Sequence, residues 1–338
     1  MKTLRFAVIG TGFWSAYQIP AWKEVAGMEL VAVYNRTRSK ATAIAEQFGI
    51  PAVYDDAEEL LQKESPDFID IITNVETHSF FTRMAAEKGI PVICQKPMAD
   101  SLDQAREMTA FCTGRKVPFY IHENFRWQAP IRALKVAMQT GVIGIPFKAR
   151  VSFCSGFPVF DNQPALAELP HFILTDIGSH ILDICRFLFG EANNLFCLTK
   201  SVNPSIKGED VANVLMQMQS GLHCFAEMSY ASVPEKESFP QTLILVEGDK
   251  GSLHLTNDFV LKTTTRSGTI ETVVQPPVYQ WADPGYSLVH ASIVECNRDI
   301  ANGLRGGVCE TTGIDNLKTT ELVWAAYQSA AAGKVILI

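Results

Sequence analysis

The first 120 residues alternate between two hydrophobic patterns, and this alternation constrains the fold more than any other feature. Short runs that are apolar throughout, as in strands buried on both faces, occur at residues 4–9, 30–34, 68–72, 92–94 and 119–121. Segments of helical periodicity separate them, at residues 15–26, 39–48, 57–63, 77–88 and 102–113. Buried strands joined by helices form a parallel sheet with helices on both sides. The pattern predicts a Rossmann-type, doubly wound α/β domain over residues 1–122.

The pattern changes after residue 122. Helical segments at residues 131–139, 174–188, 286–302 and 314–331 surround a series of strand-like runs at 147–153, 195–202, 211–218, 222–230, 242–247, 252–255, 259–264 and 270–274. Successive strands without crossover helices pair in antiparallel fashion. We therefore expect residues 123–338 to form a C-terminal α+β domain with a mostly antiparallel open sheet. A chain of 338 residues is long enough for two such domains.

Charge and cysteine usage exclude several classes of partner. The net charge is −7 and the sequence has no block of like charges, so we expect neither nucleic acid nor an anionic membrane as a partner. The N-terminal apolar stretch resembles a signal peptide, but Gly10 and Gly12 interrupt it. The eight cysteines are scattered without paired spacing, which is typical of reduced thiols in a cytoplasmic protein.

The first apolar run ends in a glycine-rich turn, Gly10-Thr11-Gly12-Phe13-Trp14-Ser15, where a helix begins. Gly10 permits a tight turn, and Gly12 lets the backbone approach a pyrophosphate that the helix N-terminus attracts. Ser15 stands where the fingerprint has its third glycine. We predict that this turn, with Phe13 and Trp14, binds a dinucleotide. The alternative is an ordinary strand-to-helix turn without a ligand.

The second apolar run ends in Asn35-Arg36-Thr37-Arg38-Ser39-Lys40. NAD-binding domains usually carry an acidic residue here, which binds the ribose hydroxyls and repels a 2′-phosphate. This chain has Asn35 instead, followed by Arg36, Arg38 and Lys40, and an arginine can also stack on adenine. The segment favours NADP(H) as cofactor, with NAD(H) as the other option. A solvated helix start is the alternative interpretation.

Lys96 follows the apolar run 92–94, in the segment Gln95-Lys96-Pro97. Lysine is seldom buried, and proline prevents the strand from continuing. The carboxyl edge of a parallel sheet is where such folds bind ligands. We therefore interpret Lys96 as a functional residue, which Pro97 restricts to extended geometry.

Asp176 and His180 lie four residues apart in a predicted helix and project from one face. A histidine titrates near neutral pH and can exchange a proton with substrate, while a carboxylate orients it. Two other interpretations remain: Asp176 at a favourable helix N-terminus beside an interior histidine, or a pair of metal ligands. No further cluster of ligating residues supports a metal site, and we expect no metal.

Taken together, the motifs resemble those of the Gfo/Idh/MocA family of oxidoreductases, which includes inositol and sugar dehydrogenases. The resemblance rests on Gly10-x-Gly12, Lys96-Pro97 and Asp176-x-x-x-His180, in that order along nearly the whole chain. It implies an NAD(P)-dependent dehydrogenase or reductase acting on CH–OH groups. The implied substrate is a secondary alcohol or hemiacetal of a sugar, sugar acid or cyclitol. The family usually associates through its open sheet, which implies a homodimer or homotetramer.

The resemblance also implies roles for individual residues. Lys96 would hydrogen-bond the reacting hydroxyl, His180 would act as general acid/base, and Asp176 would bind a neighbouring hydroxyl or orient His180. Removing hydride from an alcohol requires loss of its proton, so a base and a cation at one oxygen suit this chemistry. Further cofactor contacts are expected from Thr73, Asn74, His78, Gln95 and Lys96 itself. The family usually has proline in place of Asn74 and glutamate in place of Gln95.

Residues 122–128, His-Glu-Asn-Phe-Arg-Trp-Gln, follow the last strand of the first domain. We consider His122, Asn124 and Arg126 as substrate or nicotinamide contacts, with a polar hinge between the domains as the alternative. Two other functions stay open for the whole chain. One is a non-catalytic NAD(P)-binding regulator that senses redox state, and the other is a lyase or glycosidase-like relative that recycles bound NAD.

Overall fold

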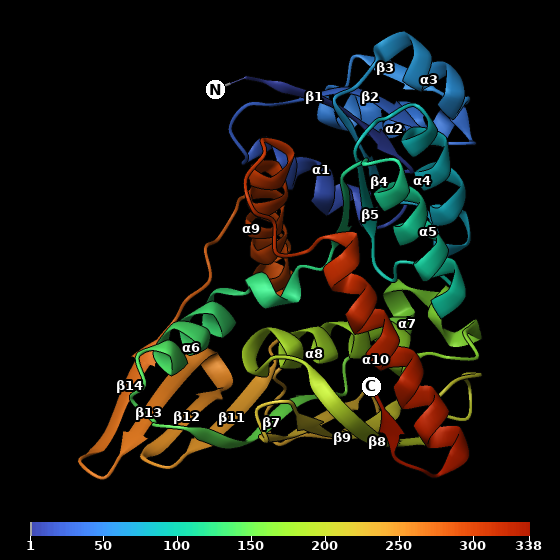
Figure 1. Cartoon of the computed structure of the whole chain (residues 1–338). Coiled ribbons are helices and arrows are strands. Elements are labelled where there is room, and N and C mark those ends of the chain that lie inside the picture. The colour runs from blue at the N-terminus through green and yellow to red at the C-terminus, as the bar shows by residue number, and fades with distance from the viewer. Residues whose placement is uncertain (1) are drawn as a thin grey trace. The chain divides into compact units, whose positions relative to one another are not determined.

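Two separate β-sheets organise the chain (Figure 1), and each belongs to its own folding unit. The computed structural model describes residues 2–338. The first unit runs to Asn124 and also includes Tyr279–Pro284 and His290–Thr320. The second unit comprises Phe125–Val278, Gly285–Val289 and Glu321–Ile338.

The first unit contains a six-stranded sheet in the order β3-β2-β1-β4-β5-β6, parallel at every pairing. This is the strand order of the dinucleotide-binding Rossmann fold, so the predicted doubly wound domain is confirmed. Its strands are β1 Leu4–Ile9, β2 Met28–Tyr34, β3 Ala52–Tyr54, β4 Phe68–Ile71, β5 Val92–Gln95 and β6 Phe119–His122. Its helices are α1 Ser15–Lys23, α2 Arg38–Phe48, α3 Ala57–Glu64, η1 Val75–Thr77, α4 His78–Glu87 and α5 Leu102–Gly114, and most of α9 Ser287–Leu304.

The strands of the first sheet are buried as their apolar composition predicts. In β4 every residue is buried, including the carboxylate of Asp70, which is fully inaccessible to solvent. β3 was not expected from the sequence, because its three residues are too few to show a hydrophobic period. Helix α9 belongs with this unit rather than with the second sheet, because Ile293 and Val294 pack against Ala21 of α1.

The second unit contains a nine-stranded sheet in the order β14-β13-β12-β11-β7-β10-β9-β8-β15. All pairings are antiparallel except that of β10 with β7, so the predicted mostly antiparallel sheet is confirmed. Its strands are β7 Pro146–Cys154, β8 Ala192–Lys200, β9 Val211–Met218, β10 His223–Ser229, β11 Leu243–Gly248, β12 Gly251–Thr256, β13 Val260–Thr265, β14 Gly268–Val273 and β15 Ile336–Leu337.

One face of this second sheet is covered by helix α8, Ile173–Phe189, which packs against β7, β9 and β10. Side chains along β9 alternate between buried and exposed, as expected for a sheet with one covered face. The remaining helical segments are η2 Phe125–Trp127, α6 Ala129–Gln139, α7 Val159–Asn162, η3 Pro164–Glu168, η4 Asn257–Phe259, η5 Pro284–Tyr286 and α10 Gly313–Ala332, which begins in the first unit.

The carboxylate of Glu209 fixes the start of α8. It accepts hydrogen bonds from the backbone N–H groups of Phe172 and Leu174, at 3.4 and 3.3 Å. A carboxylate at a helix N-terminus satisfies free N–H groups and interacts well with the helix dipole. The hydroxyl of Tyr327 donates a further bond to Glu209 at 2.7 Å. This anchoring sets where the Asp176–His180 turn begins.

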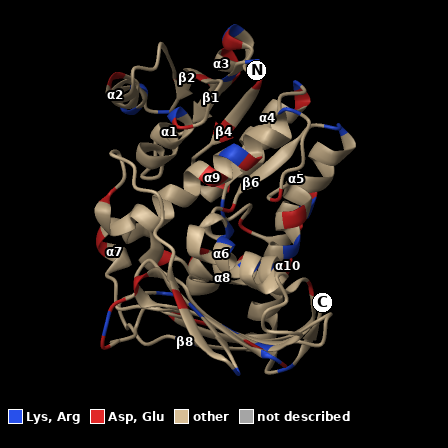
Figure 2. Cartoon of the chain, turned by 90° about the vertical axis from the view of Figure 1, so that its left-hand side faces the viewer, with Lys and Arg blue, Asp and Glu red and all other residues tan. Residues whose placement is uncertain are grey.

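Acidic and basic residues are interspersed along the ribbon of both units (Figure 2), in keeping with a sequence that has no block of like charges. Across residues 2–338, no helix has both the length and the apolar character needed to cross a bilayer.

Candidate active site

The glycine-rich turn between β1 and α1 has no room for side chains at its first position. Gly10 adopts φ +108°, and a Cβ there would lie 2.7 Å from Cγ2 of Thr73 and 2.8 Å from the carbonyl oxygen of Ile72. The hydroxyl of Ser15 donates to the carbonyl of Gly12 at 2.7 Å, which closes the turn. A side chain at Gly10 would therefore displace the segment after β4 or distort the turn.

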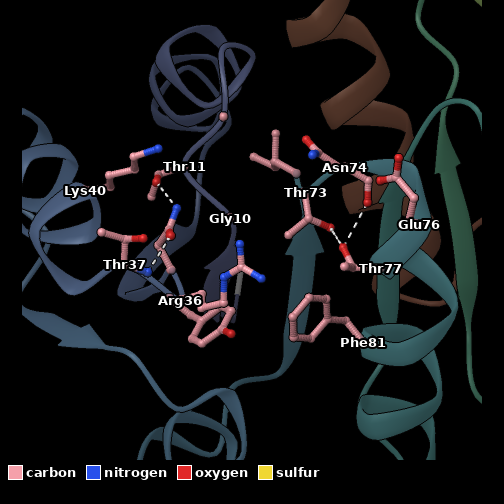
Figure 3. A pocket seen from close by; sticks show the side chains of 14 residues that line it. Gly10, Thr11, Arg36, Thr37, Lys40, Thr73, Asn74, Glu76, Thr77 and Phe81 are labelled. Atoms are coloured by element: carbon pink, nitrogen blue, oxygen red, sulfur yellow. Dashed lines mark hydrogen bonds between the residues drawn. The ribbon is translucent and has the colours of Figure 1, made fainter. Parts of the chain in front are cut away.

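This turn forms one wall of a pocket of about 450 Å³ within the first unit (Figure 3). The pocket opens at the carboxyl edge of the sheet, where β1, β2 and β4 end. It brings together seven residues predicted to contact the cofactor: Gly10, Gly12, Asn35, Arg36, Lys40, Thr73 and Asn74. The rest of the lining comes from Thr11, Tyr34, Thr37, Ile72, Glu76, Thr77 and Phe81. The lack of a side chain at Gly10 and the pocket's polar walls suit a dinucleotide.

The segment after β2 supplies the basic wall of this pocket. Asn35 is held in place because its amide donates to the hydroxyl of Thr11, while its oxygen accepts the N–H of Thr37 at 2.9 Å. Arg36 and Lys40 both line the pocket, as Figure 3 shows. Arg38 instead forms an ion pair with Asp55, Nη1 to Oδ1 at 3.0 Å. Two of the three predicted cations therefore face the pocket.

The segment after β4 forms the opposite wall. The hydroxyl of Thr77 donates to Oγ1 of Thr73 at 2.7 Å and lies 2.9 Å from the carbonyl of Asn74. His78 lies behind this wall, outside the lining, and is 1% exposed. Its ring nitrogens each lie 3.1 Å from a carbonyl oxygen, that of Pro97 for Nδ1 and that of Thr73 for Nε2. Burial lowers the pKa of His78. A neutral imidazole carries a single N–H, so it donates to only one of these two carbonyl groups.

Lys96 directly follows β5, which ends at Gln95. Its side chain is partly buried, and the peptide bond between Lys96 and Pro97 is cis. The contact of His78 with the carbonyl of Pro97 ties this segment to the end of β4. Lys96 therefore lies at the carboxyl edge of the parallel sheet, one strand away from β4, as the sequence predicts. Phe13 is 42% exposed and packs against Trp14 and Tyr17, outside the pocket lining.

His122 is the last residue of β6 and Asn124 lies two residues further on; both are buried in the first unit. Nε2 of His122 lies 3.0 Å from Oδ1 of Asn297 in α9, and the Asn124 amide donates to the Ser292 hydroxyl at 2.7 Å. Asn297 also accepts a bond of 3.3 Å from the side chain of Gln18. Sequence reasoning did not identify Asn297, because no local pattern connects it with residues so distant in the chain.

Asp176 and His180 lie on consecutive turns of α8 in the second unit, so the predicted helical spacing is present. His180 is 4% exposed, and its imidazole is stacked on the ring of Phe125. Asp176 neighbours Tyr230: burial, together with the negative charge of Asp176 and their hydrogen bond, raises the pKa of that phenol well above its usual value. The phenol therefore stays protonated and acts as the donor to the Asp176 carboxylate.

Arg126, considered from sequence as a substrate contact, forms a buried ion pair with Asp183 in the second unit. Its Nε and Nη2 donate to Oδ2 and Oδ1 of Asp183 at 2.7 and 2.5 Å. Among residues 2–338, no group of three or more His, Cys, Asp or Glu side chains is arranged to hold a metal ion.

The Rossmann sheet with its dinucleotide pocket, followed by an α+β unit with a histidine and a carboxylate on one helix, defines a two-domain nicotinamide-dependent oxidoreductase. Residues 4–122 match the model of the oxidoreductase family with an NAD-binding Rossmann fold, GFO_IDH_MocA. Residues 131–254 match the GFO/IDH/MocA C-terminal domain. The chain belongs to the Gfo/Idh/MocA family, as its motifs predict, and is an NAD(P)-dependent dehydrogenase acting on CH–OH groups.

Two similar proteins are D-apiose dehydrogenases. That of Paraburkholderia graminis is 43% identical over 337 residues, 99% of this chain and 90% of the relative. That of Rhizobium rhizogenes is 42% identical over 337 residues, 99% of this chain and 98% of the relative. A solved oxidoreductase from Agrobacterium radiobacter, in complex with NAD+, L-tartaric acid and magnesium, has a TM-score of 0.97. It is 41% identical, with 99% of this chain and 98% of that chain covered.

Proposed function

We propose that this protein is a sugar dehydrogenase whose substrate is D-apiose or a closely related aldose. The observation that carries this proposal is similarity along the whole chain to two D-apiose dehydrogenases, at 43% and 42% identity. A cyclic aldose offers a hemiacetal carbon, and its other hydroxyl groups can hydrogen-bond a polar site. Sugar acids and cyclitols also carry several hydroxyl groups and are the next substrates to compare.

The reaction divides between three side chains. The Lys96 ammonium donates a hydrogen bond to the reacting hydroxyl and stabilises negative charge on its oxygen as the proton leaves. His180 accepts that proton, and returns it in the reverse direction. Asp176, which accepts from the phenol of Tyr230, binds a neighbouring hydroxyl and fixes the substrate's orientation. The nicotinamide, when bound, supplies the hydride acceptor.

The cofactor pocket favours NADP(H) over NAD(H). Arg36 and Lys40 line the wall that begins at the end of β2, and Asn35 occupies the position at which an acidic residue would repel a 2′-phosphate. The planar guanidinium of Arg36 suits either a phosphate or the face of adenine. The Agrobacterium radiobacter oxidoreductase, 41% identical to this chain, was solved with NAD+. Activity should therefore be measured with both cofactors.

The decisive experiment is a panel of D-apiose, other aldoses, sugar acids and cyclitols with NAD+ and NADP+, followed by the absorbance of reduced nicotinamide. Accumulation of NAD(P)H with an aldose, and a slower rate when its carbinol C–H is deuterated, supports the proposal. Product formation without net NAD(P)H would instead identify a lyase-like relative that recycles its cofactor. Tight cofactor binding without any turnover would identify a non-catalytic redox sensor.

We further propose that the protein is a cytoplasmic homodimer or homotetramer that associates through the open face of its second sheet. A row of side chains crosses this face in register: Phe196 pairs with Leu215, Leu215 with Phe225, and Phe225 with Arg150. Leu215 and Phe225 are 41% and 45% exposed, which is unusual for large apolar side chains on neighbouring strands. All eight cysteines are free thiols, in keeping with a reducing compartment.

A further inference from the structure

The imidazole of His180 lies flat against the ring of Phe125. The ring centroids are 3.8 Å apart and the planes are inclined by 6°. Both residues belong to the second unit and are buried, with 4% of His180 and 5% of Phe125 exposed. Face-to-face contact at this distance leaves little room for the imidazole to tilt or rotate. The phenyl ring therefore sets the plane in which both imidazole nitrogens lie.

An ion pair on the next residue holds Phe125 in this position. Phe125–Trp127 form the short 3-10 helix η2, and Arg126 makes two parallel hydrogen bonds to Asp183, at 2.7 and 2.5 Å. Asp183 follows His180 by three residues, so the two side chains lie on the same side of α8. The fork of an arginine fixes direction as well as distance, because both bonds lie in the guanidinium plane.

The ion pair continues into a buried network along α8. Nη1 of Arg186 lies 3.9 Å from Oδ1 of Asp183, and Arg186 also forms a two-bond pair with Glu191, both bonds at 2.9 Å. The side chains of Arg126, Arg186 and Asp183 are at most 6% exposed. Removing one partner from such a network leaves an uncompensated buried charge, which is strongly destabilising, and a fully satisfied network makes the elements that it joins more rigid. Here it fixes η2 against α8.

Such a stack has two consequences for an acid/base histidine. Proton transfer takes place along the in-plane nitrogen lone pairs, so the ring plane decides whether a nitrogen points at the reacting hydroxyl. The negative face of an aromatic ring also attracts a cation. Phe125 therefore favours the imidazolium that forms once His180 has taken the proton.

We propose that Phe125 is a positioning residue for His180, held in place by the Arg126–Asp183 ion pair, and that it sets both the direction and the basicity of the imidazole. This inference rests on the role of His180 in the proposed function. It also changes the role considered for Arg126, from contacting substrate to holding Phe125.

The test is Phe125→Leu, which keeps an apolar side chain but removes the aromatic face. We expect the NMR titration midpoint of the His180 imidazole to fall by about half a pH unit or more, the equivalent of the cation–ring attraction. The rate of hydride transfer should fall by about tenfold or more, with cofactor affinity unchanged within twofold. Phe125→Tyr, which keeps the ring, should retain both values near wild type.

Phe111→Leu is the matched control. Phe111 lies in α5 of the first unit, where the guanidinium groups of Arg83 and Arg115 face its ring at 4.6 and 3.7 Å, so it too is an aromatic ring with cationic neighbours. The Phe111→Leu variant should leave the NMR titration midpoint of His180 unchanged. Arg126→Lys keeps the charge but lacks the fork, so it should lower the His180 titration midpoint as Phe125→Leu does. It provides the test if the Phe125→Leu protein does not fold.

The histidine signal, assigned by its loss in His180→Ala, decides the inference independently of turnover. A folded Phe125→Leu protein with an unchanged midpoint and an unchanged rate would overturn the proposal for Phe125. Full activity of His180→Ala would instead overturn the proposed acid/base role, while the titration would still report whether Phe125 controls the imidazole.

Discussion

The indole of Trp22 donates a hydrogen bond of 2.7 Å to Oδ2 of Asp70, a carboxylate with no exposed surface in the middle of β4. The amide of Gln18 donates a second bond to the same oxygen at 3.0 Å. Within residues 2–338, Oδ1 of Asp70 has no hydrogen-bond partner. Both donors are neutral, and burial raises the pKa of Asp70 to about 6.

This carboxylate should make the protein less stable as pH rises. The folded-state pKa, about 6, exceeds the ordinary value of 3.8, so the folded protein binds the proton more tightly than the unfolded chain. The free energy of unfolding is therefore highest below about pH 4, where Asp70 is protonated in both states. It falls as pH rises through 6, by about 3 kcal/mol in total. Asp70→Asn keeps an acceptor for Trp22 and carries no charge. We expect it to unfold at higher temperature than wild type at pH 8 and to match it near pH 4.

Thermal unfolding of both proteins from pH 4 to pH 8 checks this prediction. Asp55→Asn is the control, because Asp55 is exposed and its pair with Arg38 lies on the surface. It should change stability by less than about 1 kcal/mol at every pH. If the difference between Asp70→Asn and wild type does not vary with pH, Asp70 is not the titrating group.

Lys96→Met and His180→Gln should each slow hydride transfer by about 10²–10⁴-fold while the cofactor still binds. Each variant removes one group that handles the charge or proton of the reacting hydroxyl. In the wild type, the rate of alcohol oxidation should rise with pH as the base loses its proton, and His180→Gln should lose this dependence. Single-turnover absorbance measurements give the rate of hydride transfer and fluorescence gives the cofactor affinity, so a slower reaction can be told apart from weaker cofactor binding. A His180→Gln protein with the wild-type pH profile would assign the base to another residue.

Secondary structure followed closely from the hydrophobic patterns. The predicted run 211–218 coincides with β9, Val211–Met218, and α8 differs from its prediction by one residue at each end. These elements are long enough to show their period. β3 has three residues, and the segment between β7 and α8 contains only short helical turns, so neither carries a readable pattern.

Site residues could be predicted only where they belong to a motif of neighbouring residues in the sequence. The glycine turn, the basic segment after β2 and the Asp176–His180 spacing each depend on neighbouring residues, and the structure has the elements they require. The partners of Arg126 and Asp70 could not be predicted in this way. Asp183 lies 57 residues from Arg126, and Trp22 lies 48 residues from Asp70. Many carboxylates and donors in the chain would have served equally well, and only the fold selects among them.

Asn35→Asp should shift cofactor preference toward NAD(H). A carboxylate at the end of β2 accepts hydrogen bonds from ribose hydroxyls and repels a 2′-phosphate. We expect kcat/KM with NADP+ to fall by about tenfold or more, and that with NAD+ to stay level or rise. Arg38→Ala is the control, since Arg38 pairs with Asp55 outside the pocket lining and should leave the ratio unchanged. An equal fall in kcat/KM with both cofactors would show that residue 35 does not discriminate between a 2′-hydroxyl and a 2′-phosphate.

Phe225→Glu should convert the oligomer to a monomer. Nine strands spaced about 4.8 Å apart, with about 3.3 Å per residue along each, give the open sheet roughly 800–1,100 Å² of face. About 800 Å² on each partner is enough for a stable interface.

Phe225 lies in the middle of this face, between Leu215 and Arg150. A carboxylate there would be buried against its own copy across a two-fold axis, which costs several kcal/mol. Light scattering coupled to size exclusion measures the mass. Val308→Glu, a substitution at an 83% exposed residue of the first unit, should leave the mass unchanged. A wild-type monomer, or an oligomer that survives Phe225→Glu intact, would exclude this face as the interface.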